Sequence, residues 1–344
     1  MKRASPFPPS DPAGVPLLEV EGLSTRFRVP GGVVRAVEDV SFTLQAGRTL
    51  GVVGESGSGK TVLARSIMGL LPPNAERRGA IRYRGVDVTG WSTRQLLDVR
   101  GPEMAMVFQD PMTSLNPFMR VGRQIAESLR WHLGLARRTA ESRSVALLDE
   151  VGIPSPHLSV DSYPHQLSGG MRQRATIAIA LACSPRLLFA DEPTTALDVT
   201  IQAQILDLLA RQQRDREMGM MLVSHDLGVV AGRTDDIIVM YAGRVVEHAP
   251  TRALFTGLRM PYTQALLEAV PRLDRPSHGR VAVIPGRPPD PSATDPGCRF
   301  APRCPYARER CRAEEPPLVE AGPSHRYRCW YPVDGPLSHP RPAA

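Results

Sequence analysis

Lysine, cysteine and long apolar runs are scarce in this 344-residue chain. No uninterrupted apolar stretch approaches the roughly 20 residues of a membrane-spanning helix, which argues against a chain that crosses a bilayer by itself. Residues 1–16 hold five prolines and lack the apolar segment typical of a secretory signal, so we expect a cytoplasmic protein. In that compartment the five cysteines are expected to be thiols or metal ligands and not disulfides.

The shortage of lysine is the most informative of these absences. Only Lys2 and Lys60 occur among the 42 basic residues, and the other 40 are arginines. A lysine retained in such a sequence indicates a site that needs a compact ammonium and that a planar guanidinium does not fit. The hydrophobic fraction, 42%, excludes a wholly disordered chain. The sequence therefore indicates that Lys60 belongs to a functional site in a folded domain.

The distribution of proline divides the chain into three parts. Five of the 34 prolines lie in residues 1–16, thirteen in 17–270 and sixteen in the last 74 residues. We therefore expect a disordered arm over residues 1–16, a folded domain over 17–270 and a turn-rich extension over 271–344. A large domain with a smaller addition also suits a chain that is longer than one core usually organises.

Short apolar runs alternate with helical patterns inside the folded domain. Continuous runs of this kind are typical of strands buried on both faces of a parallel sheet, and they occur at residues 49–53, 187–190, 220–223 and 237–240. Residues 17–28 and 36–44 alternate in part, which predicts an antiparallel layer packed against that sheet. Between residues 111 and 181 helical patterns replace strands and indicate a helical insertion. The predicted fold class is α/β.

A glycine-rich loop joins the strand at 49–53 to a predicted helix at 62–71 and has the form of a phosphate-binding P-loop. Its residues are Gly54, Glu55, Ser56, Gly57, Ser58, Gly59, Lys60 and Thr61. The glycines let successive backbone N–H groups point into one concavity, and the helix start adds partial positive charge. Lys60 would reach the β- and γ-phosphates, and the Thr61 hydroxyl would join the Mg²⁺ shell. The alternative, a strand-to-helix turn without a ligand, is disfavoured by the flanking elements and by the rarity of lysine.

An acidic pair at the end of the run 187–190 would supply the second half of such a site. Asp191 is placed to hold Mg²⁺, and Glu192 to act as general base toward an attacking water. By itself, a strand that ends in two acids is weak evidence, because a capped strand end has the same form. Together with the P-loop it predicts a site that binds and hydrolyses a nucleotide.

A second helix start suited to an anion lies far along the chain, at Leu167-Ser168-Gly169-Gly170-Met171. Ser168 has the position of an N-cap, and the two glycines expose backbone N–H groups. This segment resembles the signature motif of ATP-binding cassette (ABC) ATPases. The other motifs of that family follow in order over about residues 17–270: Gln109 matches the Q-loop, Asp198 the D-loop, His225 the switch histidine and Phe27 the aromatic that stacks on adenine.

The resemblance implies the ABC ATPase fold, hydrolysis of ATP with Mg²⁺, and a head-to-tail dimer. In that dimer the signature residues Ser168, Gly169 and Gly170 of one subunit contact the ATP held by the P-loop of the other. The implied catalytic residues are Glu192, His225 and Gln109, and the implied Mg²⁺ ligands are Thr61, Gln109 and Asp191. The roles of His225 and Phe27 have structural competitors, since a histidine at a strand end can be an ordinary partly buried side chain and an aromatic in a β-layer is more often core.

Residues 109–117, 163–166 and 261–266 are further similar to the ATPase subunits of peptide and nickel importers. This similarity implies two transmembrane permease subunits and an extracytoplasmic solute-binding protein as partners. It also implies a second ATPase subunit, which we expect to be a related but different chain. The predicted function is to power import of di- or oligopeptides from the cytoplasmic face of the cell membrane, with nickel or another solute as the alternative cargo.

The rival interpretation from another class is a soluble ABC ATPase that acts on nucleic acid or the ribosome. Such proteins usually carry two cassettes in one chain, a long coiled coil or large zinc insertions, and this sequence has none of these patterns. The arginines of the extension are also spread among acidic residues and do not form a basic stripe. No nucleic-acid partner is therefore expected.

Four of the five cysteines lie in the extension 271–344, at Cys298, Cys304, Cys311 and Cys329. Residues 297–305 resemble the C-terminal extension of dipeptide and oligopeptide importer ATPases. A short proline-rich segment buries little core, so some cross-link is expected to hold it. Zinc sites favour cysteine pairs two to four residues apart, and the wider gaps here favour a [4Fe–4S] cluster over Zn²⁺. Free structural thiols are the remaining alternative.

Overall fold

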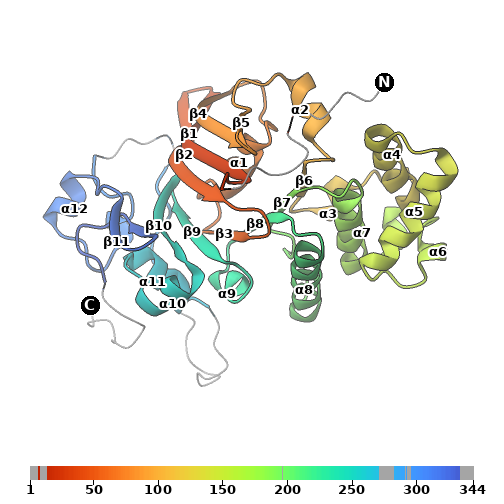
Figure 1. Ribbon diagram of the computed structural model, residues 1–344. Helices are drawn as coiled ribbons and strands as arrows, with labels where there is room; N and C mark the ends of the chain where they lie inside the picture. Colours follow the sequence, from red (N-terminus) through yellow and green to blue (C-terminus); the bar gives the residue numbers. More distant parts are fainter. Residues whose placement is uncertain are drawn as a thin grey trace.

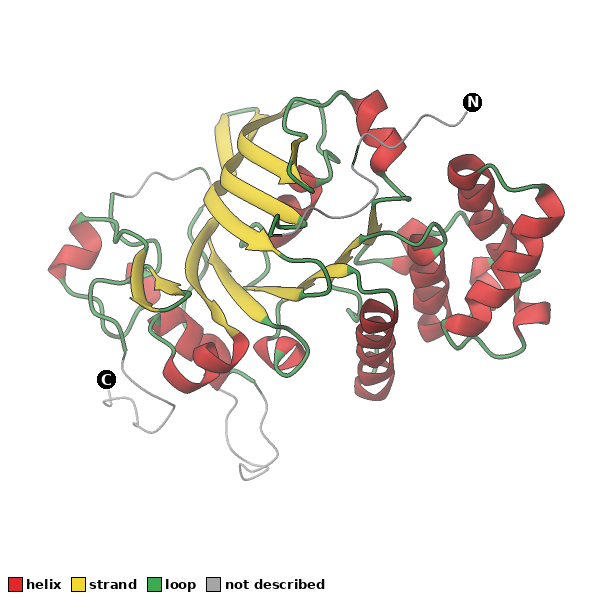
Figure 2. Ribbon diagram, in the orientation of Figure 1, coloured by secondary structure: helices red, strands yellow, loops and turns green. Residues whose placement is uncertain are grey.

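The computed structural model describes residues 7, 14–195, 197–270, 283–290, 292 and 296–333. Figures 1 and 2 show two β-sheets at the centre, a group of helices at one end and the cysteine-bearing extension at the other. Most of the predicted arm 1–16 lies outside the described residues. Within it, Phe7 is buried, with its ring edge-on to Tyr83 and stacked on Trp91 at centroid distances of 4.9 and 5.6 Å.

The first sheet is antiparallel and has the strand order β2-β1-β4-β5. Its strands are β1 (Leu18–Val29), β2 (Gly32–Leu44), β4 (Ala75–Tyr83) and β5 (Val86–Asp87). Leu23 of β1 and Val40 of β2 pair across the strands and are fully buried, while intervening side chains reach solvent. This sheet is the antiparallel layer that the partial alternation predicts.

The second sheet has eight strands in the order β11-β12-β10-β9-β3-β8-β7-β6. Its parallel part consists of β9 (Asp236–Tyr241), β3 (Thr49–Val53), β8 (Gly219–Ser224), β7 (Leu187–Asp191) and β6 (Met104–Val107). Every residue of β3, β7 and β8 is buried, which explains the continuous apolar runs in the sequence. The two sheets and their helices confirm the α/β class. Since β3, β8 and β7 are parallel neighbours, the loops that follow them meet at one edge.

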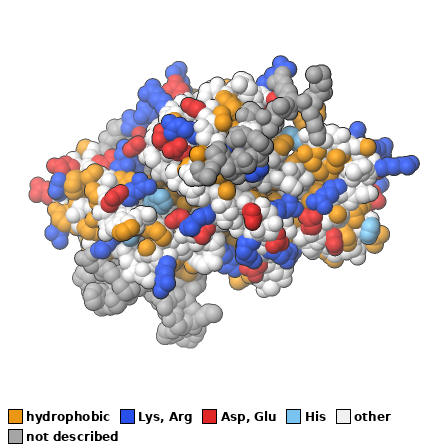
Figure 3. All heavy atoms as spheres, viewed as in Figure 1, with side chains coloured by type: hydrophobic (Ala, Val, Ile, Leu, Met, Phe, Trp, Pro, Cys, Tyr) orange, Lys and Arg blue, Asp and Glu red, His pale blue; other side chains and the backbone are white. Residues whose placement is uncertain are grey.

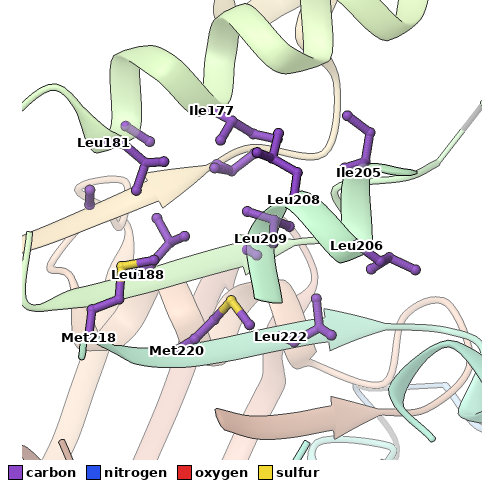
Figure 4. Packing of buried hydrophobic residues seen from close by; sticks show 14 of the residues in the cluster. Ile177, Leu181, Leu188, Ile205, Leu206, Leu208, Leu209, Met218, Met220 and Leu222 are labelled. Atoms are coloured by element: carbon purple, nitrogen blue, oxygen red, sulfur yellow. The ribbon is translucent and has the colours of Figure 1, made fainter. Parts of the chain in front are cut away.

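Helices lie on both faces of the second sheet. Helix α1 (Lys60–Ile67) lies between the two sheets, in contact with β1, β2 and β7. On the other face, α7 (Gly169–Leu181) and α8 (Val199–Asp215) pack on the strands, as Figure 4 shows for Ile177 and Leu181 of α7, Leu209 of α8, Leu188 of β7 and Leu222 of β8. Each of these side chains is buried, and each contributes about 1.5–3 kcal/mol through removal from water.

The chain between β6 and β7 forms helices only. They are α3 (Pro111–Ser114), α4 (Val121–Leu133), α5 (Arg137–Glu150), α6 (Pro156–Ser159), a 3₁₀ turn (Pro164–Gln166) and α7. Helices α4, α5 and α6 form the group at one end of the molecule in Figure 1, and α3 and α7 lie between that group and the second sheet. The remaining helices of the large domain are α2 (Thr93–Val99), α9 (Leu227–Val230), α10 (Thr251–Gly257) and α11 (Pro261–Glu268).

The extension continues the second sheet. Strand β12 (His325–Tyr327) pairs with β10 (Arg244–Pro250) and with β11 (Val319–Gly322), and α12 (Glu309–Ala313) lies beside them. Phe300 is buried in the main hydrophobic cluster, against Tyr241 and Tyr262 at 5.3 Å each. The sequence predicts a segment with little core of its own, and the structure differs in that the segment shares the core of the large domain.

The surface drawn in Figure 3 carries basic and acidic side chains interspersed, and neither sign gathers into one patch. Among the helices of the described residues, none is long and apolar enough to span a bilayer.

Candidate nucleotide-binding site

The P-loop leaves the carboxyl end of β3 and enters α1. Gly59 has φ of 101°, a backbone conformation that strains other residues, and a Cβ there would lie 2.2 Å from the carbonyl oxygen of Ala36. A Cβ on Gly54 would lie 2.2 Å from the carbonyl oxygen of Met240. Because both neighbours are backbone atoms that cannot rotate away, glycine is required at each position. The loop is thus held closely between β2 and β9.

Lys60 is the first residue of α1, and its side chain is only 4% exposed. The ammonium donates to the carbonyl oxygens of Gly54 at 2.7 Å and Glu55 at 2.9 Å, and it lies 3.8 Å from the Glu192 carboxylate. Burial lowers the pKa of Lys60, and the nearby acids oppose this shift. Three oxygens at this spacing suit a compact ammonium with three N–H groups, which explains why lysine occurs here in an arginine-rich chain.

Thr61 and Asp191 meet beside Lys60, where the Thr61 hydroxyl donates to Oδ1 of Asp191 at 2.9 Å. Asp191 is completely buried, and its other oxygen, Oδ2, has no hydrogen-bond partner among the described residues. Burial raises the pKa of the Asp191 carboxyl. A buried carboxylate oxygen without a partner is costly, and next to a hydroxyl it is an oxygen ligand of the kind that Mg²⁺ prefers. The residues present therefore fit a bound Mg²⁺ ion.

Three side chains converge on one oxygen of Glu192, the residue that follows Asp191. Oε2 accepts hydrogen bonds from Nε2 of Gln109 at 3.1 Å and from the Thr195 hydroxyl at 3.0 Å, and Nδ1 of His225 lies 3.1 Å away. The backbone of Glu192 has φ of 44°, a strained conformation that persists where the surroundings fix it. The structure thus brings together Glu192, Gln109 and His225 from three separate loops. Thr195 joins them without a sequence signal, since a threonine in a loop has no distinguishing pattern.

The contact between Glu192 and His225 shifts the titration of both groups. The hydrogen bond to His225 lowers the pKa of Glu192, and the same bond raises the pKa of His225. The charged form of each side chain is therefore favoured. His225 is 57% exposed, so solvent screens the pair and leaves the imidazole accessible to a ligand.

Phe27 lies on β1 near the P-loop. It pairs with Val34 of β2, two residues before Ala36, which contacts Gly59. The side chain is partly exposed and belongs to neither hydrophobic cluster of the described residues. Its ring is therefore available to stack on a ligand at the P-loop.

The signature residues lie away from the P-loop. Ser168 caps α7 by accepting from the N–H of Met171 at 3.3 Å, and Asp198 caps α8 in the same way. Figure 1 places α1 and α7 on separate parts of the molecule. Within the described chain, no hydrogen bond or ion pair connects residues 168–170 with 54–61.

The four cysteines of the extension line one small, apolar cavity. Burial raises the pKa of Cys304 to about 11 and that of Cys329 to about 12. In the part of the chain that the structure describes, no group of three or more His, Cys, Asp or Glu has an arrangement that would hold a metal ion. The four predicted cysteine ligands thus lie around one cavity, but among the described residues they do not have an arrangement that would hold a metal ion.

Comparison with known proteins identifies the family. Residues 37–195 match the family described as ABC transporter, and residues 246–311 match the region described as oligopeptide/dipeptide transporter, C-terminal region. The oligopeptide transport ATP-binding protein OppD of Salmonella typhimurium is 48% identical over 324 residues, which cover 94% of this chain and 96% of that protein. The chain belongs to the ABC transporter family.

Other similar proteins support the same family assignment. The dipeptide transport ATP-binding protein DppD of Escherichia coli is 48% identical over 319 residues, with 92% of this chain and 97% of that protein covered. Among solved structures, the dimeric ABC transporter cassette MJ0796 has a TM-score of 0.62 at 24% identity and covers 68% of this chain and 99% of that one. The CbiO1 subunit from Clostridium perfringens has a TM-score of 0.60 at 26% identity and covers 70% and 90%. The predicted ABC ATPase fold is confirmed.

Proposed function

We propose that this chain is the ATP-hydrolysing subunit of an importer for di- or oligopeptides, attached to the cytoplasmic face of the cell membrane. The observation that carries the cargo class is the match of residues 246–311 to the C-terminal region of oligopeptide/dipeptide transporters. The names of the two bacterial relatives support the same class. No distinct observation favours nickel.

The side chains at the edge of the second sheet have the roles that hydrolysis needs. Lys60 and the P-loop N–H groups would bind the phosphates, and Thr61, Gln109 and Asp191 would hold the Mg²⁺ ion. When bound, Mg²⁺ neutralises charge on the phosphates. Glu192 takes the proton of the attacking water as general base, because its carboxylate is kept in the ionised form and is held in place by Gln109 and Thr195. The exposed face of His225 donates toward the departing phosphate.

The separation of the signature from the P-loop is the basis for proposing a dimer. Ser168, Gly169 and Gly170 of one cassette would complete the phosphate site of the other, with Asp198 at the contact between them and Phe27 against adenine. The solved cassette MJ0796 is described as dimeric, including a state bound to ADP and Pi. The second cassette here is a related but different ATPase chain in our proposal.

The permease subunits would dock near Gln109. Three apolar side chains close to Gln109 in the sequence are exposed at the surface. Phe108 is 37% exposed, Met112 58% and Phe118 91%. Exposed aromatic and methionine side chains at the start of a helical insertion suit a partner helix. An extracytoplasmic solute-binding protein would deliver the peptide to the permease. The interspersed charges on the surface do not favour nucleic acid as the partner.

Affinity purification of the chain from its native cells tests the proposed function. We expect it to bring down two multi-span membrane proteins, a second ATPase and an extracytoplasmic binding protein, because the exposed apolar side chains beside Gln109 need a partner. Deletion of the gene should abolish uptake of a labelled peptide and leave nickel uptake unchanged. Retention of RNA or DNA without membrane proteins would contradict the proposal, and loss of nickel uptake alone would change the cargo.

We also propose that the four extension cysteines hold a [4Fe–4S] cluster after they lose their protons. The shared cavity supports this, since all four cysteines line it, and cluster binding requires thiolates. Protein purified without oxygen should be brown and contain roughly four irons per chain. Cys329→Ser should lower the iron content, whereas Cys183→Ser should not, because Cys183 is buried elsewhere, near the Ser128 carbonyl. A colourless protein with one zinc, or with no metal, would contradict the cluster.

A further inference from the structure

Arg303, a residue of the cysteine-bearing extension, reaches the P-loop. It forms a two-pronged ion pair with Glu55, in which Nη1 lies 2.6 Å from Oε2 and Nη2 lies 2.9 Å from Oε1. We propose that Arg303 is a positioning residue for ATP binding: it fixes Glu55 and thereby holds the P-loop in its phosphate-binding form. The extension would then be a working part of the nucleotide site, in addition to any role that its cysteines have.

The guanidinium of Arg303 is buried and hydrogen-bonded to several neighbouring groups. Its side chain is 4% exposed, and it also donates from Nε to the Pro285 carbonyl at 2.8 Å and from Nη1 to the Tyr241 hydroxyl at 3.3 Å. A buried guanidinium with this many partners has one orientation, since its planar fork fixes the direction of each N–H group. The ion pair with Glu55 is therefore rigid, in contrast to ion pairs at the surface.

Glu55 transmits this restraint to Lys60. Its carbonyl oxygen accepts from the Lys60 ammonium at 2.9 Å, and its N–H donates to the Tyr262 hydroxyl at 2.8 Å. The carboxylate, carbonyl and N–H groups of one P-loop residue are thus each held, and the carboxylate is held from the extension. Small displacements of a positioning group are costly at such sites, because the N–H groups and the ammonium must converge on the same phosphates.

Charge gives Arg303 a second effect on the same residue. Glu55 is a carboxylate in the middle of a loop that must receive an anion, and its side chain is 25% exposed. Paired with Arg303, it contributes little net charge to the site. Without Arg303, its negative charge would repel the incoming phosphates. Loss of Arg303 should therefore weaken ATP binding more than loss of both partners of the ion pair.

The segment that presents Arg303 is a 3₁₀ turn (Ala301–Arg303) between two cysteines. The N–H of Ala301 donates to the carbonyl of Cys298, and the N–H of Cys304 donates to that of Ala301. Phe300 packs the turn against Tyr241 and Tyr262, and the Tyr262 hydroxyl accepts from the N–H of Glu55. A group bound by the thiols at either end would fix the same turn. The inference itself rests on ATP binding at the P-loop and not on peptide transport.

The test measures the dissociation constant for ATP with the purified full-length chain, by equilibrium dialysis with radiolabelled ATP. We expect Arg303→Met to raise it by on the order of tenfold, through the loss of positioning and the unpaired Glu55. The double variant Arg303→Met, Glu55→Gln should bind ATP more tightly than Arg303→Met alone. The matched control is Arg310→Met, because Arg310 lies in the same extension but pairs with Glu314 at the surface. Its dissociation constant should stay within about twofold of the unaltered chain.

The double variant separates an effect of Arg303 that acts through Glu55 from a role in stabilising the extension alone. If Arg303 only stabilised the extension, removing Glu55 as well would not restore binding, and that result would overturn the inference. Unchanged ATP affinity in a folded Arg303→Met chain would do the same. If that variant fails to fold, Arg303→Lys replaces it, with an expected weakening of about threefold because lysine lacks the two-pronged fork; affinity equal to that of the unaltered chain would then decide against the proposal. Failure of the unaltered chain to bind ATP would instead refute the proposed function.

Discussion

Glu192→Gln should bind ATP as well as the unaltered chain and lose turnover by about 10²- to 10⁴-fold. The amide keeps the shape of the side chain and the contact with Thr195, but it does not take a proton from water. Glu192 lies 3.8 Å from the Lys60 ammonium, so neutralising it removes a negative charge beside the phosphate site, which favours phosphate binding. ATP should therefore remain bound in the closed dimer. Turnover is measured as phosphate release and closure as an ATP-dependent increase in mass.

The matched control for this variant is Thr195→Val, which removes one hydrogen bond to Glu192 and leaves the carboxylate. We expect a loss of turnover of roughly tenfold or less, since Gln109 and His225 still hold the same oxygen. Undiminished turnover in Glu192→Gln would show that another group is the base.

Lys60 gives the second large effect. Lys60→Met should weaken ATP binding by on the order of 100-fold, because a charged donor to the phosphates is lost. Lys60→Arg should still weaken it by at least about tenfold, although the charge is kept. The side chain is 4% exposed and its nitrogen is already within 2.9 Å of two carbonyl oxygens, so the larger guanidinium must displace the loop.

The control for Lys60→Arg is the reverse exchange on the same helix, Arg65→Lys, at an exposed position. ATP affinity should be unchanged there, as measured by the same dialysis. If Lys60→Arg bound ATP normally, the explanation of the lysine shortage would be wrong, and the loop would accept either cation.

The parts of the fold that were predictable from sequence are those in which burial is continuous. Strands β3, β7 and β8 match the predicted apolar runs within one residue at each end, because both faces of these strands are covered. Strand β4 carries Arg77 and Arg78 and has no clear alternation, so its sequence gives no strand signal. Strand β6 has four residues and follows a turn, which is too short for a periodic pattern.

Some residues of the nucleotide site were likewise predictable from the sequence, and others were not. The P-loop, Asp191 and Glu192 are adjacent to strands that the sequence identifies, and parallel order then brings them to one edge. Residues that act through distant segments could not be found: Tyr262 meets Glu55 across 207 positions and Arg303 meets it across 248. The pairing of β12 with β10 also joins segments far apart in the chain, and nothing in a short polar strand specifies its partner.

The central claim is that two cassettes enclose ATP, each with its P-loop facing the signature of the other. The most direct measurement is the mass in solution of the Glu192→Gln chain mixed with its partner ATPase. The mass is compared with ATP and with ADP, once for the chain with Ser168 intact and once for the chain that also carries Ser168→Arg. ATP should double the mass of the cassette with Ser168 intact, and Ser168→Arg should prevent this while its own P-loop still binds ATP. An ATP-bound chain that keeps the mass of one cassette in the presence of its partner, or a Ser168→Arg chain whose mass still doubles with ATP, would contradict the account.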